Sequence, residues 1–162
     1  MIKLIIFDLD GVLVDTKEIH KIALNKALKS IAGVKYVISD EEHHNYYDGI
    51  PTKEKLILLN KYKKLPKKYN DLINQNKKKE TNNLLKNKIK KNLKLISLVS
   101  KLSKKYKLAC ASNAIRSTVD ICLKLLGISK FFDFTISNEE ISKPKPHFEM
   151  FYRCMIACDI PA

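Results

Sequence analysis

The most constraining feature of the sequence is a pair of carboxylates at the end of its first apolar segment. Residues 2–7 are largely apolar and predict a short, buried strand of a parallel sheet, and Asp8 and Asp10 follow at once within FDLDGVLVD. Unpaired carboxylates at the end of a buried strand repel each other and lose hydration, so they need partners there. This stretch therefore predicts a functional site.

The order of the predicted elements places that strand in an α/β fold. A helix over residues 17–31 opens a long helical stretch, and no further strand pattern appears before YKLACASN at 106–113. A helix over 115–126 that stops at a glycine, a third strand near 134–137 and a final apolar helix complete the chain. This alternation predicts a doubly wound, Rossmann-like parallel sheet with helices on its faces.

The helical stretch between the first two strands is too long for a simple crossover. We interpret residues 16–83 as an inserted α-helical cap, and residues 1–15 together with 84–162 as the core. The second part of the core would begin with a single helix, whose apolar stripe consists of Leu85, Ile89, Leu93 and Ile96.

The net charge of +14 raises the question of a polyanionic partner. The cations are 29 lysines and only two arginines, whereas base recognition and bidentate phosphate binding favour arginine. Lysine is enriched together with asparagine and isoleucine, as in proteins from genomes biased towards A and T. We therefore expect a solvated lysine-rich surface and regard nucleic acid as an unlikely partner.

Four cysteines, at 110, 122, 154 and 158, form no C-x-x-C pair and predict buried, reduced thiols. No apolar run approaches the roughly 20 residues that span a bilayer, so no membrane contact is expected. Asp8 and Asp10 interrupt the N-terminal apolar stretch, which argues against a signal peptide. These observations together predict a cytoplasmic protein, whose oligomeric state the sequence leaves open.

Polar residues also follow the other two predicted strands. Ser112 and Asn113 end the second, Lys143 follows the third, and the carboxyl ends of parallel strands meet at one edge of the sheet. Two carboxylates, a hydroxyl, an amide and an ammonium suit a phosphoryl group. One aspartate can attack phosphorus, and the other can protonate the leaving oxygen and later activate water. Mg²⁺ would neutralise the repulsion between the two carboxylates.

Three segments, DLDGVLVDT, ASN and SKPKP, resemble motifs I, II and III of the haloacid dehalogenase (HAD) superfamily. Their spacing resembles the branch with a helical cap, which holds phosphoglycolate phosphatase-like enzymes and β-phosphoglucomutase. The resemblance implies that Asp8 is the nucleophile and Asp10 the general acid/base. It further implies that the Asp8 side chain and the Asp10 backbone carbonyl bind Mg²⁺, and that Ser112 and Lys143 bind the phosphoryl group.

The resemblance extends to the predicted cap. Thr16 and His20 match positions of the mutase-like members, and Gly49 matches the substrate loop of the cap. Lys53 is a candidate for binding the distal anion of the substrate, although a solvated lysine is the simpler interpretation. Asp15 suits a helix cap as well as a substrate contact, and His43 and His44 are interpreted as surface residues.

The sequence departs from the family pattern in one respect. The fourth motif, an acidic segment after a further strand that completes the magnesium site, is not reached, because the sequence given stops at CDIPA. Asp159 comes too early to replace it. We expect either a part of a longer enzyme or a truncated protein with poor metal affinity, in which an exposed sheet edge would favour aggregation.

Three functions are compatible with these residues. The first is a Mg²⁺-dependent phosphatase that acts on a small phosphorylated metabolite through an aspartyl phosphate. The second is a sugar-phosphate mutase of the β-phosphoglucomutase type, and the third is a truncated, non-catalytic, basic protein that binds polyanions.

Overall fold

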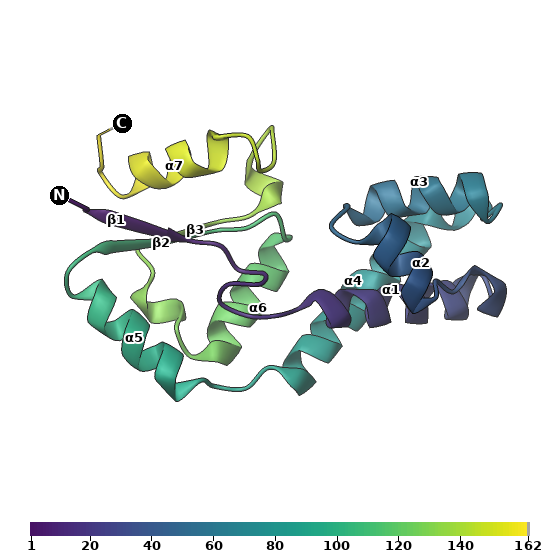
Figure 1. Ribbon diagram of the computed structural model, residues 1–162, viewed down its shortest axis with the longest axis horizontal. Coiled ribbons are helices and arrows are strands. Elements are labelled where there is room, and N and C mark those ends of the chain that lie inside the picture. The colour runs from purple at the N-terminus through teal and green to yellow at the C-terminus, as the bar shows by residue number, and fades with distance from the viewer. Residues whose placement is uncertain (162) are drawn as a thin grey trace. The chain divides into compact units, whose positions relative to one another are not determined.

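The computed structural model describes residues 1–161, which form two compact units. The first consists of residues 1–16 and 85–161, and the second of residues 17–84. The first holds a parallel sheet and is called the sheet unit below, and the second is called the helical unit (Figure 1).

The sheet has three parallel strands in the order β1-β2-β3, with bounds Leu4–Phe7, Lys107–Ala111 and Phe134–Ile136. Phe7 pairs with Cys110, and Ala111 pairs with Ile136. The three strands therefore end at one edge of the sheet, and the segments that follow them lie next to each other. Each strand was predicted from its apolar residues, and the predicted α/β fold is confirmed.

Helices cover both faces of the sheet. Figure 1 shows α7 (Glu149–Ala157) on one face and both α5 (Leu93–Ser103) and α6 (Arg116–Leu126) on the other. The core beneath α7 consists of small and medium apolar side chains from the strands and the helix: Ala109, Ala111, Ile136, Met150, Cys154 and Cys158. Helix α6 ends at the predicted glycine, because Gly127 adopts the left-handed φ of 77° that closes the helix.

One predicted helix is wrong in its extent. The stripe that includes Leu85 and Leu93 belongs to two helices, since α4 (Asn70–Lys88) ends before Leu93 begins α5. The Asn92 side chain accepts a hydrogen bond of 3.1 Å from the backbone N–H of Leu95 and caps the new helix. Four lysines at 86, 88, 90 and 91 crowd the break, where their mutual repulsion disfavours a continuous helix.

The helical unit packs its helices around one apolar core. Its main elements are α1 (Lys17–Ile31), α2 (Asp40–Glu42), the π-helix η2 (His43–Tyr47), α3 (Thr52–Tyr62) and most of α4. Short 3₁₀ turns lie at Val34–Tyr36 and Lys67–Tyr69. The largest fully buried side chains of this core are Leu24, Leu28, Ile38, Leu59 and Ile73.

The four cysteines are free and buried, as predicted. Burial raises the pKa of the Cys110 thiol to about 12, and the neighbouring Asp8 carboxylate acts in the same direction. A thiol in that state is a poor nucleophile. Among the residues that the structure describes, none of the helices has the length and apolar character needed to cross a membrane.

Candidate active site

The segment after β1 forms a tight turn that presents both aspartates. Leu9 is fully buried, and its carbonyl accepts hydrogen bonds from the backbone N–H groups of Leu13 (3.0 Å) and Val14 (3.1 Å). Gly11 has a φ of 80°, which favours glycine, and its N–H donates to the Val14 carbonyl at 2.8 Å. The buried side chains of Leu9 and Leu13 thus anchor the turn and leave Asp8 and Asp10 on its outside.

Asp8 lies at the mouth of the site and is held by two donors. Its Oδ1 accepts a hydrogen bond of 2.7 Å from the backbone N–H of Leu9. The same oxygen lies 2.8 Å from the Lys145 ammonium, in an ion pair in which the Asp8 side chain stays 44% exposed. A carboxylate held in this way keeps a defined position and still meets solvent.

The lysine that pairs with Asp8 is Lys145, whereas Lys143 was the lysine expected to bind the phosphoryl group at this site. Both lysines precede a proline in SKPKP, so the motif alone fits either. The Lys143 side chain is exposed, and its backbone N–H, like that of Ser142, donates to the Glu149 carboxylate. Glu149 therefore holds this part of the loop by its backbone, and Lys145 is the residue that reaches the strand ends.

The end of β2 supplies the third side of the site. Ser112 is buried, and its hydroxyl accepts a hydrogen bond of 3.0 Å from the N–H of Ala114. The Ser112 N–H donates to the Ile136 carbonyl, which joins the ends of β2 and β3. The side chain of Asn113 bonds to the backbone of Lys145. The structure thus brings together Asp8, Ser112, Asn113 and Lys145, which come from all three strand ends.

Asp10 is exposed and accepts a hydrogen bond from the buried hydroxyl of Thr16, which begins the link to the helical unit. The hydroxyl orients one carboxylate oxygen of Asp10. An exposed, oriented carboxylate two residues after Asp8 suits proton transfer to a bound substrate.

Carboxylate oxygens are the ligands that Mg²⁺ prefers, and the ion commonly uses one or two carboxylates with water and a substrate phosphate. The Asp8 carboxylate and the Asp10 backbone carbonyl are oxygen donors at the exposed end of β1, so this turn fits the ion. Across residues 1–161, no cluster of three or more His, Cys, Asp or Glu side chains suits a metal.

In the helical unit, His20 lies on α1 and is half-buried. Lys77 on α4 places its ammonium 3.2 Å from Nδ1 of His20. An ammonium can only donate, so Nδ1 accepts and the ring proton is on Nε2. Burial, followed by the positive charges of Lys77 and Lys55, lowers the pKa of His20 to about 3. His20 is therefore neutral at physiological pH and orients Lys77.

This arrangement makes the stability of the protein depend on pH. Because the folded-state pKa of His20 is about 3, against 6.5 for an ordinary histidine, the unfolded chain takes up a proton first as the pH falls. The stabilisation is complete above pH 6.5 and declines towards pH 3, by up to about 1.4 kcal/mol per pH unit. Urea unfolding at pH 7.0, 5.5 and 4.5 should show a steeper loss for the wild type than for His20→Gln.

His44, which is exposed, supplies the matched control for that measurement. His44→Gln should follow the wild-type pH dependence. Parallel curves for the wild type and His20→Gln would contradict the proposed neutral state of His20.

The remaining predicted residues of the helical unit lie between η2 and α3. Gly49 is exposed with a φ of 72°, and Lys53 is exposed in the first turn of α3. His44 is exposed as expected, but His43 is buried, which corrects its interpretation as a surface residue. Its ring lies in the π-helix, where burial, and next the charge of Lys55, lower its pKa.

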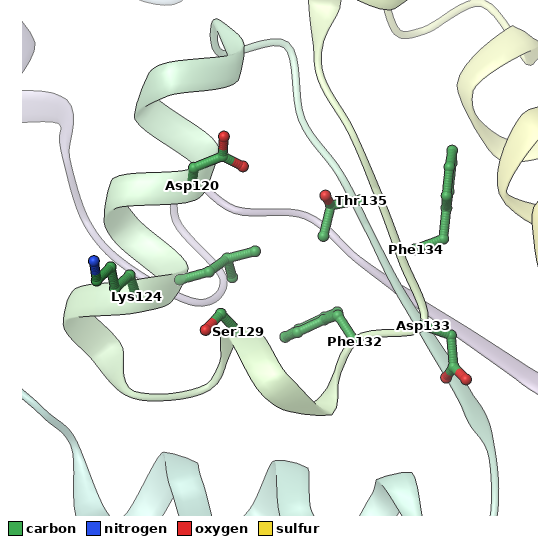
Figure 2. Close-up of a pocket in the computed structure, with 8 residues that line it drawn as sticks. Asp120, Lys124, Ser129, Phe132, Asp133, Phe134 and Thr135 are labelled. Atoms are coloured by element: carbon green, nitrogen blue, oxygen red, sulfur yellow. The ribbon is translucent and has the colours of Figure 1, made fainter.

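The pocket drawn in Figure 2 lies elsewhere in the sheet unit. It has a volume of about 570 Å³ and is lined by residues of α6 and of the segment that leads into β3, including Asp120, Phe132, Asp133 and Phe134. Asp133 precedes β3 and Asp8 follows β1, so in a parallel sheet the two stand at opposite edges. The lining of the pocket holds two carboxylates, Asp120 and Asp133, against one cation, Lys124, so it lacks the excess of positive charge that would attract a phosphate.

Sequence reasoning missed Lys145 and Lys77. For Lys145 a signal was present, since KPHFEMF places a second Lys-Pro pair immediately before the last helix. For Lys77 the sequence carries no such signal, because it stands among three consecutive lysines. Only the packing of α4 on α1, which brings Lys77 to His20, distinguishes it.

The chain matches the haloacid dehalogenase-like hydrolase family over residues 5–161. It is 26% identical over 152 residues to a "phosphorylated carbohydrates phosphatase" of Thermotoga maritima, an alignment that covers 91% of this chain and 66% of the relative. The chain thus spans slightly less than two thirds of that relative.

Solved structures show the same fold. CbbY from Rhodobacter sphaeroides, determined in complex with phosphate, is 22% identical, with a TM-score of 0.82 over 99% of this chain and 74% of that one. A β-phosphoglucomutase from Clostridium difficile is 25% identical, with a TM-score of 0.74 over 99% of this chain and 72% of its own. The predicted HAD-like fold with a helical cap is confirmed, and the chain belongs to the haloacid dehalogenase-like hydrolase family.

Proposed function

We propose that the protein is a phosphatase that hydrolyses a small phosphorylated metabolite through an aspartyl phosphate on Asp8. The observation that carries the proposal is the convergence of Asp8, Ser112 and Lys145 at the ends of parallel strands, with the Lys145 ammonium 2.8 Å from Asp8. The family match and the similarity to a phosphatase of phosphorylated carbohydrates support the same reaction class.

Each residue then has a defined role. A carboxylate oxygen of Asp8 attacks phosphorus, the bond to the leaving oxygen breaks, and Asp10 donates a proton to that oxygen. Asp10 then takes a proton from water, which attacks the aspartyl phosphate and releases orthophosphate. Lys145 and the hydroxyl of Ser112 stabilise the charge on the phosphoryl oxygens. Lys145 thus takes the role that the sequence analysis gave to Lys143.

Mg²⁺ is the proposed cofactor, and the Asp8 side chain with the Asp10 backbone carbonyl would hold it. When bound, the ion neutralises charge on the carboxylates and the phosphate, so that one anion can approach another. Lys145 contributes part of the same neutralisation from the side of the protein.

We further propose that residues 17–84 act as a cap that selects the substrate. They hold 15 lysines against eight aspartates and glutamates, a balance that attracts anionic substrates. The proposed substrate-binding residues of the cap are His20, through its contact with Lys77, together with Gly49 and Lys53. A cytoplasmic location remains a prediction, which the four free cysteines support.

Hydrolysis should outpace phosphoryl transfer between substrates. A mutase must exclude water while the aspartyl phosphate persists. The surfaces of α3 and α4 are rich in exposed lysines, and a cap with such a surface should admit water when it closes over the substrate. The full-length protein should be incubated with a panel of sugar phosphates, and both free phosphate and isomerised sugar should be measured. Isomerisation that outpaces phosphate release and depends on a bisphosphate primer would favour the mutase instead.

Polyanion binding is a second candidate function. Residues 85–107 contain nine lysines and no acidic residue, whereas the rest of the sheet unit has seven lysines and arginines against nine acids. A concentration of cations of this kind can attract an anionic partner, although nucleic acid remains an unlikely one. The test is to measure binding to a nucleic-acid homopolymer at several salt concentrations. A linear fall of log affinity with log salt concentration, in a protein without phosphatase activity, would support this function.

A further inference from the structure

Asn113 and Lys145 are joined by a reciprocal pair of hydrogen bonds. The backbone N–H of Lys145 donates to Oδ1 of Asn113 at 3.0 Å, and Nδ2 of Asn113 donates to the backbone carbonyl of Lys145 at 3.1 Å. One carboxamide thus binds both backbone polar groups of a single residue, as a neighbouring strand would. Asn113 follows β2, whereas Lys145 lies 32 residues later in the loop before α7.

The other end of Lys145 is fixed as well. Its ammonium lies 2.8 Å from Oδ1 of Asp8 and donates to the carbonyl of Ala111 at 3.0 Å. The Lys145 side chain is only 15% exposed. The residue therefore spans the site, with its backbone on the segment after β2 and its ammonium on the ends of β1 and β2.

A second attachment, through Glu149, holds a different part of the loop. Glu149 accepts hydrogen bonds from the backbone N–H groups of Ser142 and Lys143, at 3.0–3.1 Å, and pairs with Arg153 at 2.8 Å. Glu149 thus binds the backbone of Ser142 and Lys143, whereas Asn113 binds the backbone of Lys145. A lysine side chain is long and flexible, so the position of its ammonium depends on where its backbone is held.

We propose that Asn113 is a positioning residue, whose side chain holds the Lys145 backbone so that the ammonium reaches Asp8 and the phosphoryl group beside it. The inference rests on the proposed phosphatase function and deepens it. It changes the role of Asn113 from substrate binding to the support of another residue. Misplacing a charged group by about 1 Å can reduce a rate by about 100-fold, so this support has a measurable effect.

A double-mutant cycle tests the proposal. Asn113→Ala, Lys145→Met and the double variant of the full-length protein are compared with the wild type, using an aryl phosphate as substrate. Asn113→Ala should lower kcat by between about 10- and 100-fold, with a smaller change in KM. In the Lys145→Met background, Asn113→Ala should lower kcat by less than about twofold, because the lysine that Asn113 positions is already lost.

Asn138→Ala is the matched control, because Asn138 is an exposed asparagine of the same unit and should leave kcat unchanged. Asn113→Ser replaces Asn113→Ala if the latter does not fold. A second readout is independent of turnover. The amide of Lys145 should exchange its hydrogen slowly in the wild type and at least about tenfold faster in Asn113→Ala, since the N–H loses its acceptor.

The outcomes separate the inference from the function on which it rests. Losses in kcat that multiply in the double variant, or a rise in KM that persists in the Lys145→Met background, would overturn the positioning role alone. Unprotected exchange at Lys145 in an active wild-type protein would do the same. A wild-type protein that binds orthophosphate but turns over no phosphate ester would overturn the phosphatase function, and the positioning role with it.

Discussion

Asp8→Asn should reduce the turnover of an aryl phosphate by at least about 10⁴-fold, the scale seen when a catalytic nucleophile is removed. The amide keeps the size of the carboxylate but has no anionic oxygen that can attack phosphorus. It would also lose the charge that pairs with the Lys145 ammonium at 2.8 Å. Initial rates of phosphate release by the full-length protein, with and without added Mg²⁺, provide the measurement.

Asp159→Asn is a suitable control, because Asp159 is an exposed aspartate of the same unit and lies beyond α7. It should retain activity within about twofold of the wild type, as most surface substitutions leave the fold intact. Activity of Asp8→Asn within tenfold of the wild type would remove Asp8 from the role of nucleophile.

Lys145→Met should have the second-largest effect, a loss in kcat/KM of between about 10² and 10³-fold, as when one charge-stabilising donor is removed from an active site. Methionine retains much of the length of lysine but cannot neutralise the phosphoryl charge or bind Asp8. The same substitution at Lys143 should change kcat/KM by less than about threefold, because the Lys143 side chain is exposed.

The two lysines form a matched pair, since each precedes a proline in the same loop. Thermal unfolding of both variants tests whether either change disturbs the fold. A large loss for Lys143→Met with little change for Lys145→Met would show that the ion pair with Asp8 has no part in the reaction.

Much of the sheet unit could be predicted from the sequence because its signals are local. An apolar run followed by DLDG predicted the first strand and the placement of Asp8 and Asp10 at its end, since buried strands need apolar residues. The end of α6 at Gly127 was predicted because glycine readily adopts the left-handed conformation that closes a helix.

The errors arose where tertiary contacts decide the outcome. The apolar stripe through Leu85 and Leu93 is an exception, because the signals that divide it are local: the Asn92 side chain caps α5, and the lysines before it repel each other. The choice between Lys143 and Lys145 depends on Glu149 and Asn113, which hold the loop from two different elements. His43 was placed on the surface because it stands in a polar stretch, yet the π-helix turns its ring inward.

Chemical trapping of the intermediate is the most direct test of the central claim. The test uses the Asp10→Asn variant of the full-length protein, in which proton transfer is slowed. The variant is mixed with substrate and Mg²⁺, quenched, and treated with borohydride. Borohydride reduces an acyl phosphate to an alcohol. Peptide mass spectrometry should find homoserine at position 8 and unmodified aspartate elsewhere. Phosphate release by the wild type with no reduction at position 8, or with reduction at another carboxylate, would contradict an aspartyl phosphate on Asp8.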